Sequence, residues 1–315
     1  MAWVMTFAAL AAVAWGVSDF LAGLLARRIP VLTILIGSKV AAMLLAVVVV
    51  AARGVPPPDD SRLWLGVVAG LIGFPAMGLL YRAMRDGSLV VVAPVAAVAA
   101  LVPVGWGLLH GERLGMVAAL GVVIGLIGVT MASWPVASQR RPPRSAQACA
   151  LGAAIGLGVY FVLLHEAAAA DQIWSTALAR MTGGSLALLF LITVRRLPRP
   201  PRDVVEPIRQ STGKTACPQV GLRPQPALRL LPKSPSARTG LAIAVPVSLV
   251  GATDALADAS FILAASAALA PAAVVASLYP AVTLLLNRSL LRERLHTVHL
   301  YGVLAALFAV ACLAR

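Results

Sequence analysis

The chain alternates between long apolar runs and short polar connectors. Each run has about 17–24 residues, which is long enough for a helix to cross the hydrocarbon core of a bilayer. Lipid offers the backbone no hydrogen-bond partners, so such runs form helices. The pattern predicts an all-α membrane protein with ten transmembrane helices, over residues 3–25, 31–52, 62–81, 88–109, 114–133, 147–165, 172–194, 240–263, 269–287 and 297–314.

The two halves of the chain resemble each other. A shift of 142 residues pairs Gly16 with Gly158, and a shift of 181 pairs later positions: Gly70 with Gly251, Glu112-Arg113-Leu114 with Glu293-Arg294-Leu295, and Gly121 with Gly302. Five spans per half is an odd number, so the second half enters the membrane from the opposite side. We therefore predict two inverted five-helix repeats, 1–134 and 147–315, joined by a short basic connector at 135–146.

Composition supports a bilayer as the solvent. Hydrophobic residues make up 60% of the 315 residues and charged residues only 12%, whereas a soluble domain has about 25% charged residues. The net charge is +14, but the basic residues lie between the apolar runs and form no helical stripe, so we expect no nucleic-acid partner. Connectors after odd-numbered spans hold 20 of the 26 Lys and Arg residues. The positive-inside rule then predicts cytoplasmic odd connectors and external termini, in a multi-pass plasma-membrane protein.

The stretch at 195–239 differs from the other connectors. It lies inside the second repeat and is rich in Pro and Arg, with ten basic and two acidic residues. Such a composition predicts a flexible cytoplasmic loop. Binding to anionic lipid headgroups is a second interpretation of its charge.

Five ionisable residues fall inside predicted spans: Asp19, Lys39, Arg180, Asp254 and Asp258. Charge within hydrocarbon is costly, so such residues face the bundle interior or a wet cavity. Their depths predict two ion pairs, Asp19 with Lys39 toward the cytoplasm, and Arg180 with Asp258 or Asp254 toward the outside. These pairs either gate or contact a substrate, or they only neutralise one another.

Two aromatic residues occupy equivalent parts of the halves. Trp15 and Tyr160 lie beside the paired glycines Gly16 and Gly158. They either line a cavity or pack in the core of the bundle. The sequence does not decide between these interpretations.

Several short motifs together resemble the EamA-type transporters of the drug/metabolite transporter superfamily. They are Ala14-Trp15-Gly16, the two Glu-Arg-Leu elements with the following glycines Gly121 and Gly302, and Leu278-Tyr279-Pro280. The resemblance covers nearly the whole chain except about 200–239. It implies a central cavity between the halves, lined by spans one to four and six to nine, and alternating access without ATP hydrolysis.

The sequence therefore predicts a secondary transporter, an exporter of a small organic metabolite, with Trp15, Asp19, Lys39, Tyr160 and the charged residues of spans seven and eight at its substrate path. Glu112, Arg113, Glu293 and Arg294 are interpreted as structural repeat motifs. We expect no enzyme activity, cofactor or metal. A lipid-carrier flippase or an accessory membrane subunit is the alternative function, and a homodimer is compatible with the sequence.

Overall fold

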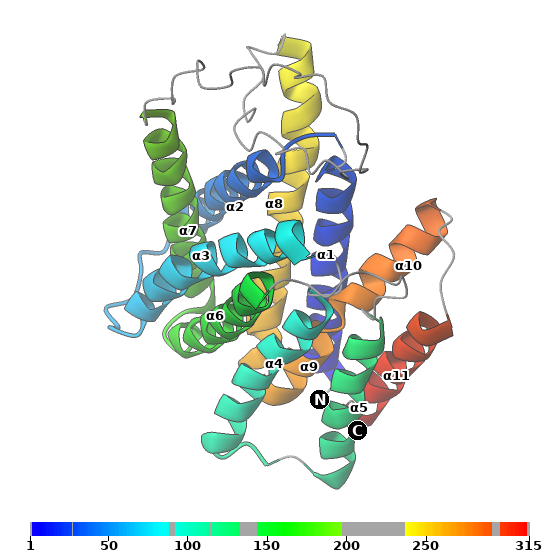
Figure 1. Ribbon diagram of the computed structural model, residues 1–315. Helices are drawn as coiled ribbons and strands as arrows, with labels where there is room; N and C mark the ends of the chain where they lie inside the picture. The colour runs from blue at the N-terminus through cyan, green and yellow to red at the C-terminus, as the bar shows by residue number, and fades with distance from the viewer. Residues whose placement is uncertain are drawn as a thin grey trace, which may run out of the picture.

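The computed structural model describes residues 2–26, 28–87, 92–113, 115–132, 144–196, 237–291 and 297–313. These residues contain eleven helices and no strand (Figure 1). The helices are α1 (Ala2–Ala26), α2 (Val31–Arg53), α3 (Leu63–Gly87), α4 (Val92–Leu109), α5 (Met116–Ala132), α6 (Arg144–Ala168), α7 (Gln172–Arg196), α8 (Ala237–Ala265), α9 (Leu269–Ala276), α10 (Tyr279–Leu291) and α11 (Thr297–Leu313).

The helices coincide closely with the apolar runs. Seven helical stretches of the described residues are long and apolar enough to cross a membrane, so the chain is a multi-pass membrane protein. The count of ten spans stays a prediction. Both ends of the loop expected at 195–239 are helical, since α7 continues to Arg196 and α8 begins at Ala237. Residues 197–236 lie outside the described residues.

One predicted span is two helices. The run at 269–287 breaks after Ala276, and α10 begins at Tyr279. Pro280 explains the break, because proline has no N–H to donate to the carbonyl of Ala276 and its ring crowds that carbonyl. The break leaves Ser277 and Tyr279 beside the centre of the bundle.

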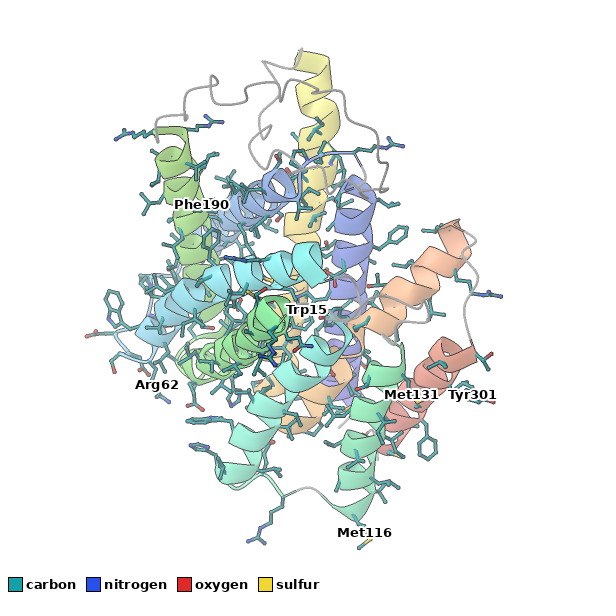
Figure 2. All side chains as sticks on the ribbon, in the orientation of Figure 1. Trp15, Arg62, Met116, Met131, Phe190 and Tyr301 are labelled. Atoms are coloured by element: carbon teal, nitrogen blue, oxygen red, sulfur yellow. The ribbon has the colours of Figure 1, made fainter. Side chains whose placement is uncertain are left out.

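Large apolar side chains cover the outside of the bundle. Met116 is 90% exposed and Tyr301 is 58% exposed, and both point away from the other helices in Figure 2. Trp15, by contrast, lies toward the middle of that view. An apolar exterior of this kind suits lipid contact.

The most extensive packing joins helices from different halves of the chain. The pairs are α1 with α8, α3 with α6, α2 with α7, and α5 with α11. The last pair stands together at the lower right of Figure 1. By contrast, α1 and α2, which are neighbours in sequence, hardly pack on each other. The bundle core is therefore built mainly from contacts between the halves.

Glycines allow the closest of these contacts. A Cβ on Gly70 would meet Thr182 of α7 at 2.7 Å, and a Cβ on Gly251 would collide with the carbonyl of Ser38 in α2. Likewise, Gly16 faces Val282 and Gly158 faces Val102, each at 2.6 Å. Residues paired by the sequence shifts thus make equivalent contacts. Small residues at such crossings let helix backbones approach closely in a membrane.

We expect Gly251→Ala to destabilise the protein, because the added methyl group overpacks the crossing of α8 with α2. The expected loss is about 1–3 kcal/mol. The matched control is Gly78→Ala, since Gly78 has no atom within 4 Å of an added Cβ. Thermal melting of both variants in detergent measures the difference. Equal melting temperatures for the two variants would show that the crossing of α8 with α2 accommodates a methyl group without loss of stability, and would contradict this prediction.

Candidate functional site

A cavity of about 150 Å³ lies between the two halves of the chain. Its described lining comes from α1 to α4, from α6 to α10 and from the turn before α10, and none of it comes from α5 or α11. This is the arrangement that the family resemblance implies. All seven candidate substrate-path residues are part of the lining: Trp15, Asp19, Lys39, Tyr160, Arg180, Asp254 and Asp258.

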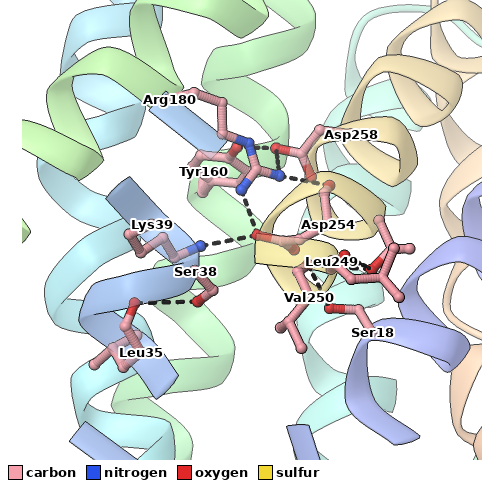
Figure 3. A network of polar contacts seen from close by, with 11 residues as sticks. Ser18, Leu35, Ser38, Lys39, Tyr160, Arg180, Leu249, Val250, Asp254 and Asp258 are labelled. Atoms are coloured by element: carbon pink, nitrogen blue, oxygen red, sulfur yellow. Dashed lines mark hydrogen bonds and ion pairs between the residues drawn. The ribbon is translucent and has the colours of Figure 1, made fainter. Parts of the chain in front are cut away.

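The guanidinium of Arg180 organises the charged wall of the cavity (Figure 3). Its Nη1 pairs with Asp254, and its Nη2 donates to the Asp254 carbonyl at 2.7 Å and pairs with Asp258 at 2.6 Å. Asp254 and Asp258 lie four residues apart on one face of α8, so the fork of a single arginine reaches both. Arg180 thereby joins α7 to α8.

Two further side chains complete this network. Lys39 Nζ of α2 lies 3.1 Å from Asp254 Oδ2, and the Tyr160 hydroxyl of α6 donates to Asp258 Oδ2. The side chains of Arg180 and Asp258 are only 5% and 3% exposed, whereas those of Lys39 and Asp254 are 15% and 21% exposed. The network therefore runs from a buried end at Asp258 to a more open end at Lys39.

One of the two predicted ion pairs is wrong. The structure confirms the contact of Arg180 with Asp258 and with Asp254, but Lys39 pairs with Asp254 and not with Asp19. The cause is the helix packing: α2 packs on α7 and α8, while α1 packs mainly on α8, α9 and α10. Lys39 is thus carried away from its sequence neighbour and toward α8.

Asp19 occupies a different part of the cavity. It is exposed, and no described residue forms an ion pair or hydrogen bond with its carboxylate. The charges of Asp19 and Asp254 repel each other. The cavity therefore holds one carboxylate outside the Arg180 network.

Aromatic rings form another wall of the cavity. The Trp15 ring centroid lies 5.2 Å from that of Phe161, 5.9 Å from Phe261 and 6.2 Å from Tyr279. These residues come from α1, α6, α8 and α10, so four helices meet here. Trp15 and Phe161 also pack against the buried apolar core. Trp15 and Tyr160 thus line the cavity, and Trp15 packs as well.

The repeat-motif residue Glu112 makes a contact between the halves. Its carboxylate accepts hydrogen bonds from the Leu269 and Ala270 amides, the latter at 2.9 Å. These amides lie at the N-terminus of α9, where the free N–H groups of a helix favour a negative charge. Arg113 is exposed. Glu293 and Arg294 lie outside the described residues.

Two more polar contacts join the halves near the same connectors. Arg53, at the end of α2, lies 2.7 Å from Asp171, which also accepts from the Ile173 and Trp174 amides at the start of α7. Trp106 of α4 donates to Glu166 of α6 at 2.7 Å. With Glu112, these contacts define what we call the clamped end of the bundle.

Several of these residues were not predicted from the sequence. Phe161, Phe261, Arg53, Asp171 and the pair of Trp106 with Glu166 were not singled out. The aromatic residues carry no signal that separates cavity lining from packing. Asp171 had one: an Asp directly before a long apolar run is a typical helix N-cap. Within the described residues no cluster of His, Cys, Asp and Glu could hold a metal ion.

Comparison with known proteins agrees with this geometry. The sequence pattern of the EamA-like transporter family matches residues 2–134. Residues 2–134 belong to the EamA-like transporter family. That family is part of the drug/metabolite transporter superfamily, so the resemblance seen in the sequence is confirmed for residues 2–134. Members of this EamA family are membrane transporters of small molecules and are typically not enzymes.

The fold likeness extends beyond the EamA-like half. A solved chain described as "Crystal structure of protein" has a TM-score of 0.68 and 16% identity, and the match covers 98% of this chain and 97% of that chain. At this identity the likeness shows the fold alone. None of the curated protein sequences that were compared matches the chain.

We expect Arg180→Met to be strongly destabilising, because it leaves the carboxylates of Asp254 and Asp258 without their main counter-charge. Breaking a buried pair in this way costs about 3–5 kcal/mol. Lys39→Met should cost less, since Arg180 still neutralises Asp254. Melting temperatures in detergent, compared at equal expression, rank the variants. If Arg180→Met melts like the unmodified protein, the network contributes little to stability.

The pair of Arg53 with Asp171 should make stability depend on pH. The side-chain hydrogen bond from Arg53 lowers the pKa of Asp171, and the amides of Trp174 and Ile173 add to the effect. A carboxyl with a lowered pKa stabilises the fold above its ordinary pKa, near 4, and loses that contribution as pH falls through the lowered value. Asp171→Asn should therefore lower the melting temperature at pH 7, and the difference should shrink as the pH falls from 7 to 3. A constant difference across that range would contradict this assignment.

Proposed function

We propose that the protein has ten transmembrane helices in two inverted five-helix repeats, 1–134 and 147–315, with α9 and α10 forming one broken span. The packing pairs support this architecture, because each crossing has a counterpart in the other half: α1 with α8 matches α3 with α6, and α2 with α8 matches α3 with α7. The glycine contacts of Gly16 and Gly158 follow the same relation. Inverted repeats of this kind are common in secondary transporters.

We propose that the protein is a secondary transporter of a small organic metabolite, an exporter in the plasma membrane. The observation that carries this proposal is the central cavity, whose charged wall combines Lys39 from the first half with Arg180, Asp254 and Asp258 from the second. Ionisable residues at membrane depth mark solute paths in many membrane proteins. A substrate bound here contacts both halves at once.

The two ends of the bundle differ in a way that suits alternating access. On one side the cavity reaches Asp19, which is exposed. On the other side of the cavity lies the buried core of α1, α6, α8 and α9. The clamped end also lies on this side, and there Glu112 binds α9 and Arg53 binds Asp171. Opening the clamped end requires these contacts to break, and they join one half to the other. The motion we propose is therefore a rocking of the halves that exchanges the open end.

The same features make the alternative function less favoured. A flippase for a lipid carrier needs cationic side chains that face lipid through a lateral opening. Here Lys39 and Arg180 are ion-paired and largely buried between helices.

The distribution of Lys and Arg among the connectors supports an orientation with the odd-numbered connectors in the cytoplasm. The two termini lie at the end of the bundle opposite the start of α8 (Figure 1).

We expect the purified protein in lipid vesicles to move at least one member of a broad panel of small organic solutes, with or without a proton gradient. The diagnostic variant is Gly183→Leu. Gly183 lines the cavity, and only the Gly70 carbonyl lies near its added Cβ, at 3.9 Å, so a side chain at this position starts without a clash and takes up cavity space. Flux should fall about tenfold or more, the loss expected when a solute site is filled.

Gly78→Leu is the matched control for this experiment, because Gly78 is exposed and does not line the cavity. Its flux should equal that of the unmodified protein. Two results would contradict the proposal: no flux of any solute in the panel, or equal flux through Gly183→Leu and Gly78→Leu.

A further inference from the structure

The charges that line the cavity do not balance. Among the described lining residues there are two cations, Lys39 and Arg180, and three carboxylates. Both cations are bound to Asp254 or Asp258, and Tyr160 also donates to Asp258. Asp19 is left without an ion pair inside the described part of the chain. An ionised Asp19 therefore gives the cavity an excess of one negative charge.

The surroundings of Asp19 make this excess charge costly when the cavity is empty. The carboxylates of Asp19 and Asp254 repel each other. No described cation offsets the repulsion. A positively charged ligand beside Asp19 would offset this repulsion, because it would attract a carboxylate that forms no ion pair with the described residues.

Aromatic residues stand next to this carboxylate. Trp15 lies four residues before Asp19, one turn along the same face of α1, and its ring packs against Tyr279. Phe161 and Phe261 extend the ring cluster on the second half. Aromatic faces attract cations and also bury apolar groups. The cavity thus offers a carboxylate for a positive charge and rings for an apolar body.

We propose that the substrate is an amphiphilic organic cation, a protonated amine with an apolar or aromatic body, whose charged nitrogen pairs with Asp19 and whose body packs against Trp15 and Tyr279. This inference rests on the proposed transport function and names its substrate class. An anionic substrate would have to compete with Asp254 and Asp258 for the two cations. A neutral substrate would leave the charge of Asp19 uncompensated.

The test is calorimetric titration of the purified protein in detergent at pH 7 with three matched probes: 2-phenylethylammonium, 3-phenylpropionate and 2-phenylethanol. They share one aromatic body and differ in charge. We expect saturable binding of the ammonium, with an affinity about tenfold or more above that of the other two, as a direct ion pair provides. Equal affinities, preference for the anion, or no binding of any probe would overturn the proposal.

Two variants assign the preference to Asp19. Asp19→Asn should lower ammonium affinity about tenfold, to that of 2-phenylethanol, while Asp19→Glu should retain part of it. Asp60→Asn is the control, since Asp60 lies outside the cavity and pairs with the neighbouring Arg62. Melting curves show that each variant is folded. If Asp19 binds only a proton, Asp19→Asn changes the pH dependence of stability but not the affinity for any probe, and the proposal fails.

Flux measurements separate this inference from the proposed function. If vesicles carry 3-phenylpropionate or 2-phenylethanol but not the ammonium, the substrate class is wrong and transport stands. If no solute of the broader panel is carried, the transport function itself is wrong. Flux of the ammonium that Asp19→Asn abolishes and Asp19→Glu restores in part supports both.

Discussion

The rest of the structure depends on the pairing of one buried guanidinium with two carboxylates. Arg180 cannot lie unpaired in the middle of a bilayer protein, because an isolated buried charge costs several kcal/mol. Its bonds to Asp254 and Asp258 hold α7 against α8, and Lys39 extends the network to α2 of the other half. The site and the interface between the halves are therefore the same set of contacts, and a change at one alters the other.

The repeat explains the frame of the cavity but not its chemistry. Lys39 in α2 and Arg180 in α7 are one position short of equivalent under the shift of 142 residues, and both point to α8. The positions in α3 equivalent to Asp254 and Asp258 are Gly73 and Met77, which line the same cavity without charge. Asp19 has Phe161 as its counterpart. Two similar halves thus enclose a cavity with a charged side and an apolar side, which suits an amphiphilic solute.

Apolar run length and spacing were enough to predict most helices, because bilayer thickness and backbone hydrogen bonding set those lengths. The break at Ser277 was not predicted, although Pro280 was visible and its effect on the preceding turn is known. The five embedded charges all line the cavity, since burial in a membrane restricts where charge can lie. The partner of Lys39 was mispredicted, because the pairing of α2 with α8 is a long-range contact that depth along the chain does not encode.

We propose that the cavity around Arg180 opens in turn at both ends of the bundle. Ser277 lines this cavity and is buried, so Ser277→Cys places a small thiol in the path. The three native cysteines are first replaced by serine. A membrane-impermeant maleimide is then added to one side or the other of oriented vesicles. Alternating access predicts labelling of residue 277 from both sides. Labelling from only one side, with and without transported solute, would contradict the account.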